Sequence, residues 1–391
     1  MGTFVVPFLS LFLTAERDLS IGQSGAVIAL YGLGNVCSGL ISGLLADRVG
    51  RRVILLVGLW AAAPLMLVLG FVSGFILIAA VAFAVGFFAE SYRPAAQAIV
   101  ADILPSQDLT RAYGLMYWAT NIGAGLAPLV AGLLATRSYS ALFIVDALTL
   151  AVFGIVVFLL VPETRPVTTA TTEIEPRNSN ARLQALFREP LILAICVLVF
   201  IVASVFLQVY ATLPLEMRDA GATEAQYGLV IGLNGLVVVS LQIPLISFLA
   251  RFSKPYLLAP GALAVGLGFG LTGVASSIVL YALTVVIWTI GEIIISTFAV
   301  SLVADMSPSS LRGLYMGAYS AAFAAASAAG PALGGAALER YGSEIYWPSL
   351  LVLSVIGALG FIVLAIPIRS RLQAQENSKN KASIGLEDSG R

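Results

Sequence analysis

The sequence predicts an all-α integral membrane protein, with twelve transmembrane helices in two pseudo-symmetric halves of six. Three observations predict this class: the composition, the lengths of the apolar runs and an internal repeat. Of the 391 residues, 59% are hydrophobic and 11% are charged, and the mean hydropathy is +0.97. Soluble domains are about 45–50% apolar and about 25% charged, so this chain has the composition of a protein embedded in lipid.

Twelve apolar runs are long enough, or nearly so, to cross a hydrocarbon core of about 30 Å as helices. Gly, Ala and Pro are frequent in them, which suits helices in lipid, because small residues allow close approach and neighbouring helices satisfy freed backbone groups. The alternation of a membrane β-barrel strand is not seen. The approximate limits of the twelve apolar runs are 1–14, 22–45, 53–72, 74–103, 110–136, 138–161, 190–215, 225–250, 256–275, 277–304, 312–337 and 345–368.

An internal repeat appears when the chain is shifted against itself by 203 residues. The shift pairs Gln23 with Gln226, Arg51 with Lys254, Asp102 with Asp305, Pro128 with Pro331 and Gly132 with Gly335. Such a duplication is typical of transporters whose substrate site lies between the repeats. We expect an N-terminal half at 1–161, a polar cytoplasmic linker at 162–189, a C-terminal half at 190–370 and a disordered cytoplasmic tail at 371–391.

The distribution of basic residues predicts the orientation of the chain. If the loop after the second span is cytoplasmic, sixteen Lys and Arg residues lie on that side and four on the other. By the positive-inside rule, both termini are then cytoplasmic.

The first span is the shortest. By the repeat, its counterpart would begin about a dozen residues before Met1, so we expect a truncated chain or a misassigned start codon. The alternative is a short span accommodated by a thinner bilayer. A signal peptide fits less well, since neither a basic leader nor a small-residue cleavage site is evident.

A dense charge cluster, GLLADRVGRR, occupies residues 43–52, between the second and third spans. Gly43 allows close helix approach, Gly50 permits a tight turn, and Asp47 can contact Arg51 or the positive end of a neighbouring helix. The cluster resembles the loop signature of the major facilitator superfamily, which implies a latch at the cytoplasmic face with an acid at the end of span four. The matching residues are Gly43, Asp47, Arg48, Gly50, Arg51, Arg52 and Asp102. The alternative is that these charges only set the topology. The second copy of the loop has Ala250 where the acid should be.

A second pattern of small residues lies in spans five and eleven, where it allows close packing and each proline can weaken its helix. The pattern resembles a motif of the superfamily's exporting branch, the twelve-span drug:proton antiporters, with Ala127 and Ala131 replacing glycines. An arginine that many such exporters carry in span four would fall at Ala82 and is missing. The pattern comprises Gly123, Ala127, Pro128, Gly132, Gly330, Pro331, Gly334 and Gly335.

Four charged residues lie well inside the apolar runs: Glu90, Arg93, Asp146 and Glu292. Such charges are costly in a membrane and are functional candidates by default. Glu292 has no basic neighbour in its span and is the first candidate for a proton carrier; a structural hydrogen bond is the alternative. Glu90 is the second candidate, unless it forms a structural pair with Arg93. Asp146 is the third, unless it is wetted or bonded to a neighbouring helix.

Other functional classes lack support in the sequence. Histidine is absent, and both cysteines, Cys37 and Cys196, lie in apolar runs, so we expect no metal site, cofactor or catalysis. The resemblance implies proton-coupled efflux of small hydrophobic or amphipathic compounds across a bacterial inner membrane. Protons, the substrate and lipid are then the partners, the protein is monomeric and nucleic acid plays no part. The alternatives are a sugar or metabolite transporter of the same superfamily and a non-transporting membrane sensor.

Overall fold

The computed structural model describes residues 4–163, 186, 188–308 and 311–389, and every regular element in these ranges is a helix. Inside the helices, the side chains are not described at positions 40, 43, 44, 47, 48, 93, 94, 98, 101, 106, 107, 110, 117 and 375–389.

Two helical bundles follow one another along the chain. The first contains η1 (Val6–Phe8), α1 (Leu9–Ala15), α2 (Ile21–Val49), α3 (Arg51–Phe71), α4 (Phe75–Glu90), α5 (Tyr92–Ile103), α6 (Ser106–Ala135) and α7 (Tyr139–Leu160). The second contains α9 (Pro190–Phe206), α10 (Gln208–Ala211), α11 (Leu213–Asp219), α12 (Glu224–Leu249), α13 (Lys254–Thr272), α14 (Ile278–Met306), α15 (Arg312–Tyr341) and α16 (Ser343–Ser389).

Ten helical stretches among the described residues are long and apolar enough to cross a membrane. They coincide with the third to the twelfth of the predicted spans. The first predicted span contains a shorter apolar helical stretch, Val6–Ala15, and the second coincides with α2. Among the described residues, each predicted segment thus contains a helix, and ten of these stretches meet the criterion of length and hydropathy.

The helix ends reproduce the sequence repeat. Ser20 caps the first turn of α2 by accepting a hydrogen bond from the backbone N–H of Gln23, whose side chain caps Ser20 in return. Thr223 and Gln226 form the same capping box at the start of α12. Between α2 and α3, Gly50 has a φ of +118°, a conformation that favours glycine and makes the predicted tight turn.

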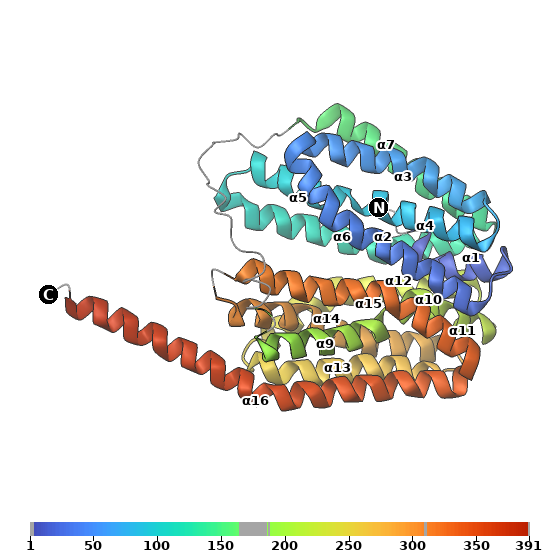
Figure 1. The fold of residues 1–391 in the computed structure, drawn as a ribbon. Coiled ribbons are helices and arrows are strands. Elements are labelled where there is room, and N and C mark those ends of the chain that lie inside the picture. The colour runs from blue at the N-terminus through green and yellow to red at the C-terminus, as the bar shows by residue number, and fades with distance from the viewer. Residues whose placement is uncertain (1–3, 164–185, 187, 309–310, 390–391) are drawn as a thin grey trace.

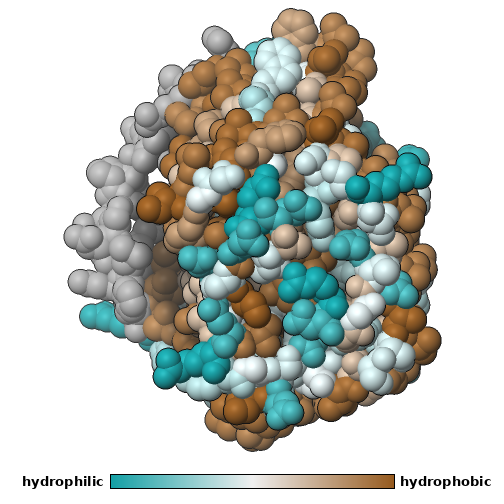
Figure 2. All heavy atoms as spheres, turned by 90° about the vertical axis from the view of Figure 1, so that its right-hand side faces the viewer, coloured by the Kyte–Doolittle hydropathy of each residue, from teal (hydrophilic) through white to brown (hydrophobic). Residues whose placement is uncertain are grey.

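The two bundles lie side by side, with α2 packed along α15 and α6 along α12. They converge at the end where α1, α10 and α11 meet and diverge toward the opposite end (Figure 1). We call the end that carries Ser20 and Thr223 the cap face, and the end that carries Gly50 the loop face. Hydrophilic residues gather in the middle of the cap face, with hydrophobic residues around them (Figure 2).

Some features differ from the sequence-based expectation. The fourth predicted span is divided at Ser91 between α4 and α5. The seventh is divided at Leu207 and Thr212 between α9, α10 and α11. The tail, expected to be disordered, continues as a helix to Ser389, and it projects away from the bundles (Figure 1). Its many Gln, Ala, Lys and Glu residues are good helix formers, so a helix that already spans the second bundle continues into it.

Candidate functional site

Glu292 forms a polar contact between two helices of the second bundle. The Asn234 side-chain amide, on α12, donates to Glu292 Oε2 at 2.8 Å and to Thr289 Oγ1 at 3.0 Å. Thr289 donates in turn to the carbonyl of Val285, one turn earlier in α14, at 2.6 Å. Among the side chains that the structure describes, no basic group forms an ion pair with Glu292. The carboxyl is thus held by a neutral donor inside a predicted span.

Glu292 is half-buried, and the residues beside it in α14 are closely packed. Gly291 lies against α13, where a Cβ would come 2.5 Å from the carbonyl oxygen of Gly261. Trp288 is buried and stacks on Phe269 with ring centroids 5.5 Å apart, while Phe206 meets it edge-on at 5.7 Å. Trp288 therefore contributes to the packing between α14, α13 and α9.

Glu90 ends α4 and is half-buried. Its neighbour Ala89, which the repeat pairs with Glu292, is buried. The first bundle thus places an acid one position away from the site equivalent to Glu292. The Arg93 side chain lies outside the described residues, so the Glu90–Arg93 pair stays a prediction.

Asp146 is fully buried in α7 and faces the start of the chain. Its Oδ2 accepts a hydrogen bond from the backbone N–H of Val5 at 3.4 Å. Val5 directly precedes η1, so the contact joins α7 to the start of the first helical stretch, and the proton role of Asp146 stays a prediction.

The repeat relates two of the ion pairs at the loop face. Arg51, at the start of α3, pairs with Asp102 near the end of α5. Lys254, at the start of α13, pairs with Asp305 near the end of α14 at 2.6 Å and donates to Ser301 Oγ at 2.7 Å. The ion pair between Arg51 and Asp102 thus has an equivalent in the second bundle. The second loop nevertheless has Ala250 at the position of Asp47 in the first loop.

The remaining loop residues are only partly described. Arg52 donates through its backbone N–H to Glu163 at 3.2 Å and through its guanidinium to the carbonyl of Phe158. The side chains of Asp47 and Arg48 and the surroundings of Gly43 lie outside the described residues, so their part in a latch stays a prediction.

Glycines meet across both seams between the bundles. A Cβ on Gly228 of α12 would come 3.0 Å from the Cα of Gly132 and still closer to the carbonyl oxygen of Pro128. A Cβ on Gly25 of α2 would meet Pro331 and Gly335 of α15 in the same way. Four positions of the predicted packing pattern therefore lie at the boundary between the halves: Pro128, Gly132, Pro331 and Gly335.

The other positions of the pattern behave differently. A Cβ on Gly330 would come 3.2 Å from the Cα of Ser204 in α9, and a Cβ on Gly334 would meet the side chain of Gln208, so both positions serve packing within the second bundle. Ala127 is buried, whereas a Cβ on Gly123 would meet nothing within 4 Å. The small-residue pattern thus serves contacts within a bundle as well as between bundles, because helix rotation assigns neighbouring positions to different partners.

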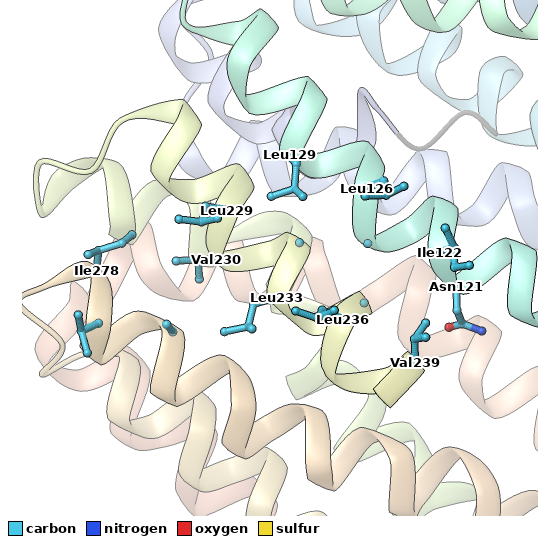
Figure 3. Close-up of a pocket in the computed structure, with 15 residues that line it drawn as sticks. Asn121, Ile122, Leu126, Leu129, Leu229, Val230, Leu233, Leu236, Val239 and Ile278 are labelled. Carbon is cyan, nitrogen blue, oxygen red and sulfur yellow. The ribbon is translucent and has the colours of Figure 1, made fainter. Parts of the chain in front are cut away.

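An apolar groove of ≈ 530 Å³ lies along the seam between α6, α12 and α14. Figure 3 shows Ile122, Leu126 and Leu129 on α6 facing Leu229, Leu233 and Leu236 on α12, with Ile278 of α14 beside them. Among its lining residues only Asn121 has a polar side chain. The groove can accommodate a hydrophobic molecule or lipid chain.

Sequence reasoning missed two parts of this arrangement. Asn234 is an amide within the apolar run GLVIGLNGLVVV, and a polar residue in such a run is itself a signal of an interhelical contact. The Lys254–Asp305 pair could have been inferred from the repeat, which aligns both residues with the first pair.

A duplicated bundle of apolar helices, with a carboxyl inside a span and glycine seams between its halves, defines the class of polytopic membrane transporters. The sequence model of the Major Facilitator Superfamily matches residues 1–299 and 209–388, so the chain belongs to this superfamily. Its members move small molecules across membranes.

Individual relatives are distant. The MFS-type transporter YqjV of Bacillus subtilis is 25% identical over 391 residues, covering 97% of this chain and 92% of the relative. A Na(+), Li(+), K(+)/H(+) antiporter of Planococcus maritimus is 22% identical, with 80% of each chain covered. The quinolone resistance protein NorA of Staphylococcus aureus is 26% identical over 49% of each chain.

Solved structures share the fold. A crystal structure of the nucleoside transporter NupG superimposes with a TM-score of 0.78 at 14% identity, covering 95% of both chains. A peptide transporter POT in complex with sulfate gives a TM-score of 0.77 at 18% identity, covering 95% of this chain and 92% of that one.

Proposed function

We propose that the protein exports small hydrophobic or amphipathic compounds in exchange for protons, with Glu292 as the proton carrier. The observation that carries the proposal is the contact of Glu292 with Asn234 at 2.8 Å, with no ion pair from the described side chains. Low polarity disfavours the charged form of a carboxyl without a cationic partner. Such a group readily takes up a proton on one side of the membrane and releases it on the other.

The coupling follows from competition at the site. Alternating access exposes a site between the repeats to one side of the membrane at a time. The protonated carboxyl of Glu292 can donate a hydrogen bond, whereas the ionised carboxyl can attract a cationic or polar part of the substrate. Protonation then promotes substrate release. Glu90 is the second proton-coupling candidate, and Asp146, bonded to Val5, ranks last.

The groove between α6, α12 and α14 supports hydrophobic substrates. Its lining is apolar apart from Asn121, so it favours molecules that partition into the bilayer over sugars, which need several hydrogen-bond partners. The relatives include a drug-resistance protein, in keeping with this class of substrate.

The proposed setting is a bacterial inner membrane with the loop face and both termini in the cytoplasm, following the excess of basic residues on that side. The protein acts as a monomer, partners only protons, substrate and lipid, and catalyses no covalent reaction. The latch at the loop face comprises Asp47 and Arg51, with Asp102 as the partner of Arg51.

The test is substrate-dependent proton movement in everted membrane vesicles, with a panel of lipophilic cationic and neutral dyes. We expect the dyes to release protons from acidified vesicles that carry the wild-type protein but not from those with Glu292→Gln. Glu344→Gln is the matched control, because Glu344 is exposed at the cap face and away from the site. Unchanged proton release in Glu292→Gln would exclude this carboxyl as the carrier.

A second candidate is exchange of monovalent cations for protons. The Glu292 carboxylate and the Thr289 hydroxyl are oxygen ligands of the kind that hard cations prefer, and one relative is a cation/proton antiporter. The same vesicles distinguish the two functions: proton movement triggered by Na⁺ or K⁺ but by no dye would favour the cation.

A further inference from the structure

A carboxylate of the second bundle contacts the first turn of a helix in the first bundle. Glu339, near the end of α15, accepts a hydrogen bond from the Ser20 hydroxyl at 2.8 Å and from the backbone N–H of Gly22 at 2.5 Å. Ser20 is the N-cap of α2 and Gly22 lies in its first turn. The contact therefore joins the two halves at the cap face.

The chemistry of a helix N-terminus makes this contact favourable. The first backbone N–H groups of a helix lack internal partners and carry partial positive charge, so a carboxylate is stabilised there. Ser20 accepts from Gln23 in the capping box and donates its own proton to Glu339, so both of its functions are used. Gly22 leaves the necessary space, since a Cβ there would lie 2.8 Å from Glu339 Oε2.

At the cap face of the other seam, between α6 and α12, the described residues form no equivalent contact of a carboxylate with a helix start. The repeat pairs Glu339 with Thr136, whose hydroxyl donates at 2.8 Å to the Leu133 carbonyl of its own helix. At this seam the Tyr139 hydroxyl, at the start of α7, donates to the Glu224 carboxylate, at the start of α12, at 2.9 Å. The Glu224 carboxylate thus accepts from a phenol, whereas the Glu339 carboxylate accepts from a backbone N–H of a helix start.

We propose that Glu339 is a positioning residue for alternating access: it latches α15 onto α2 when the cap face is closed and is released when the halves separate there. The contact stabilises the state in which the cap face is closed. This role goes beyond the proposed function, because it requires neither proton coupling nor a particular substrate.

The test measures the opening of the cap face directly. Nitroxide labels at Ser73→Cys and Ser276→Cys, two exposed positions that the repeat relates, report the separation of the bundles by electron–electron double resonance. The background carries Cys37→Ser and Cys196→Ser, and the protein is in phosphatidylethanolamine–phosphatidylglycerol liposomes without substrate, at constant pH. The variants are Glu339→Gln and Glu339→Ala, with Glu344→Gln as the control on the same face.

We expect Glu339→Gln to raise the ratio of long to short label distances about twofold to fivefold, which corresponds to the typical stabilisation of a charge at a helix end. Glu339→Ala should raise it further, and Glu344→Gln should leave it unchanged. Monodisperse elution of each variant verifies folding. An unchanged distance distribution in folded Glu339→Gln and Glu339→Ala would overturn the proposal, and it would leave the proton-carrier role of Glu292 unaffected.

Discussion

Gly228 faces Gly132 across the boundary between the two bundles, so closely that a Cβ on Gly228 would come 3.0 Å from the Cα of Gly132. The repeat reproduces the contact at the other seam, where a Cβ on Gly25 would come 3.2 Å from the Cα of Gly335. Both seams thus include places where backbone packs against backbone. Contacts without interlocking side chains can change their relative angle with little repacking, which suits halves that rock.

Replacing Gly228 tests the importance of this contact. Gly228→Val would push a side chain against the Pro128 carbonyl and Gly132, and we expect a loss of about 1–3 kcal/mol, as for other overpacked sites. The midpoint of thermal unfolding in detergent should fall, together with transport.

Gly123 provides the matched control, since it belongs to the same small-residue pattern but a Cβ there would meet nothing within 4 Å. Gly123→Ala should leave stability unchanged or raise it by up to about 1 kcal/mol through the higher helix propensity of alanine. Equal losses in Gly123→Ala and Gly228→Val would contradict the assignment of the seam.

The second prediction concerns the Lys254–Asp305 pair. Both side chains are partly exposed, at 37% and 42%, so we expect a coupling free energy of about 0.2–1 kcal/mol. A double-mutant cycle of Lys254→Gln and Asp305→Asn, read by thermal unfolding, measures it. Because salt screens exposed charges, the coupling should shrink between low and high ionic strength. A coupling that does not depend on salt would argue for a contact other than the ion pair.

Asn234 should act through Glu292. Asn234→Ala removes the donor to the carboxyl and to Thr289, and we expect a loss of about 1 kcal/mol in stability and impaired proton coupling. In the Glu292→Gln background the same substitution should have little further effect on coupling, because the carrier is already lost. Additive effects on proton release would mean that Asn234 works independently.

The fourth prediction is a pH dependence at the loop face. Arg371 donates to Glu189, just before α9, and this contact keeps the pKa of Glu189 below its ordinary value of 4.5, despite opposing desolvation. A lowered folded-state pKa stabilises the fold above pH of about 4.5, and the stabilisation is lost as the pH falls through the folded-state pKa.

Glu189→Gln should therefore lower the thermal midpoint at pH 7, and the difference from wild type should shrink as the pH approaches 4 and below. A difference that stays constant over this range would show that packing, rather than the charge of Glu189, stabilises this region.

Several features of the fold could be read from the sequence alone. The class, the positions of the helices and the duplication depend on the lengths of apolar runs and on residue spacing, which are local properties of the chain. The turn at Gly50 and the two capping boxes are local as well. Glu292 could be identified as a candidate proton carrier because it is a charged residue inside an apolar run.

The contacts of these residues depended on the tertiary structure. Whether Gly330 faces its own bundle or the other is decided by the rotation of α15 about its axis, which spacing along one helix leaves open. Asn234 meets Glu292, Asp146 meets Val5 and Glu339 meets the first turn of α2 because distant helices pack at particular heights and angles. The sequence by itself thus determined which residues cross the membrane and which charges are costly there. Only the packing of the helices decided what each charge contacts, since the energy of a buried polar group depends on its partner.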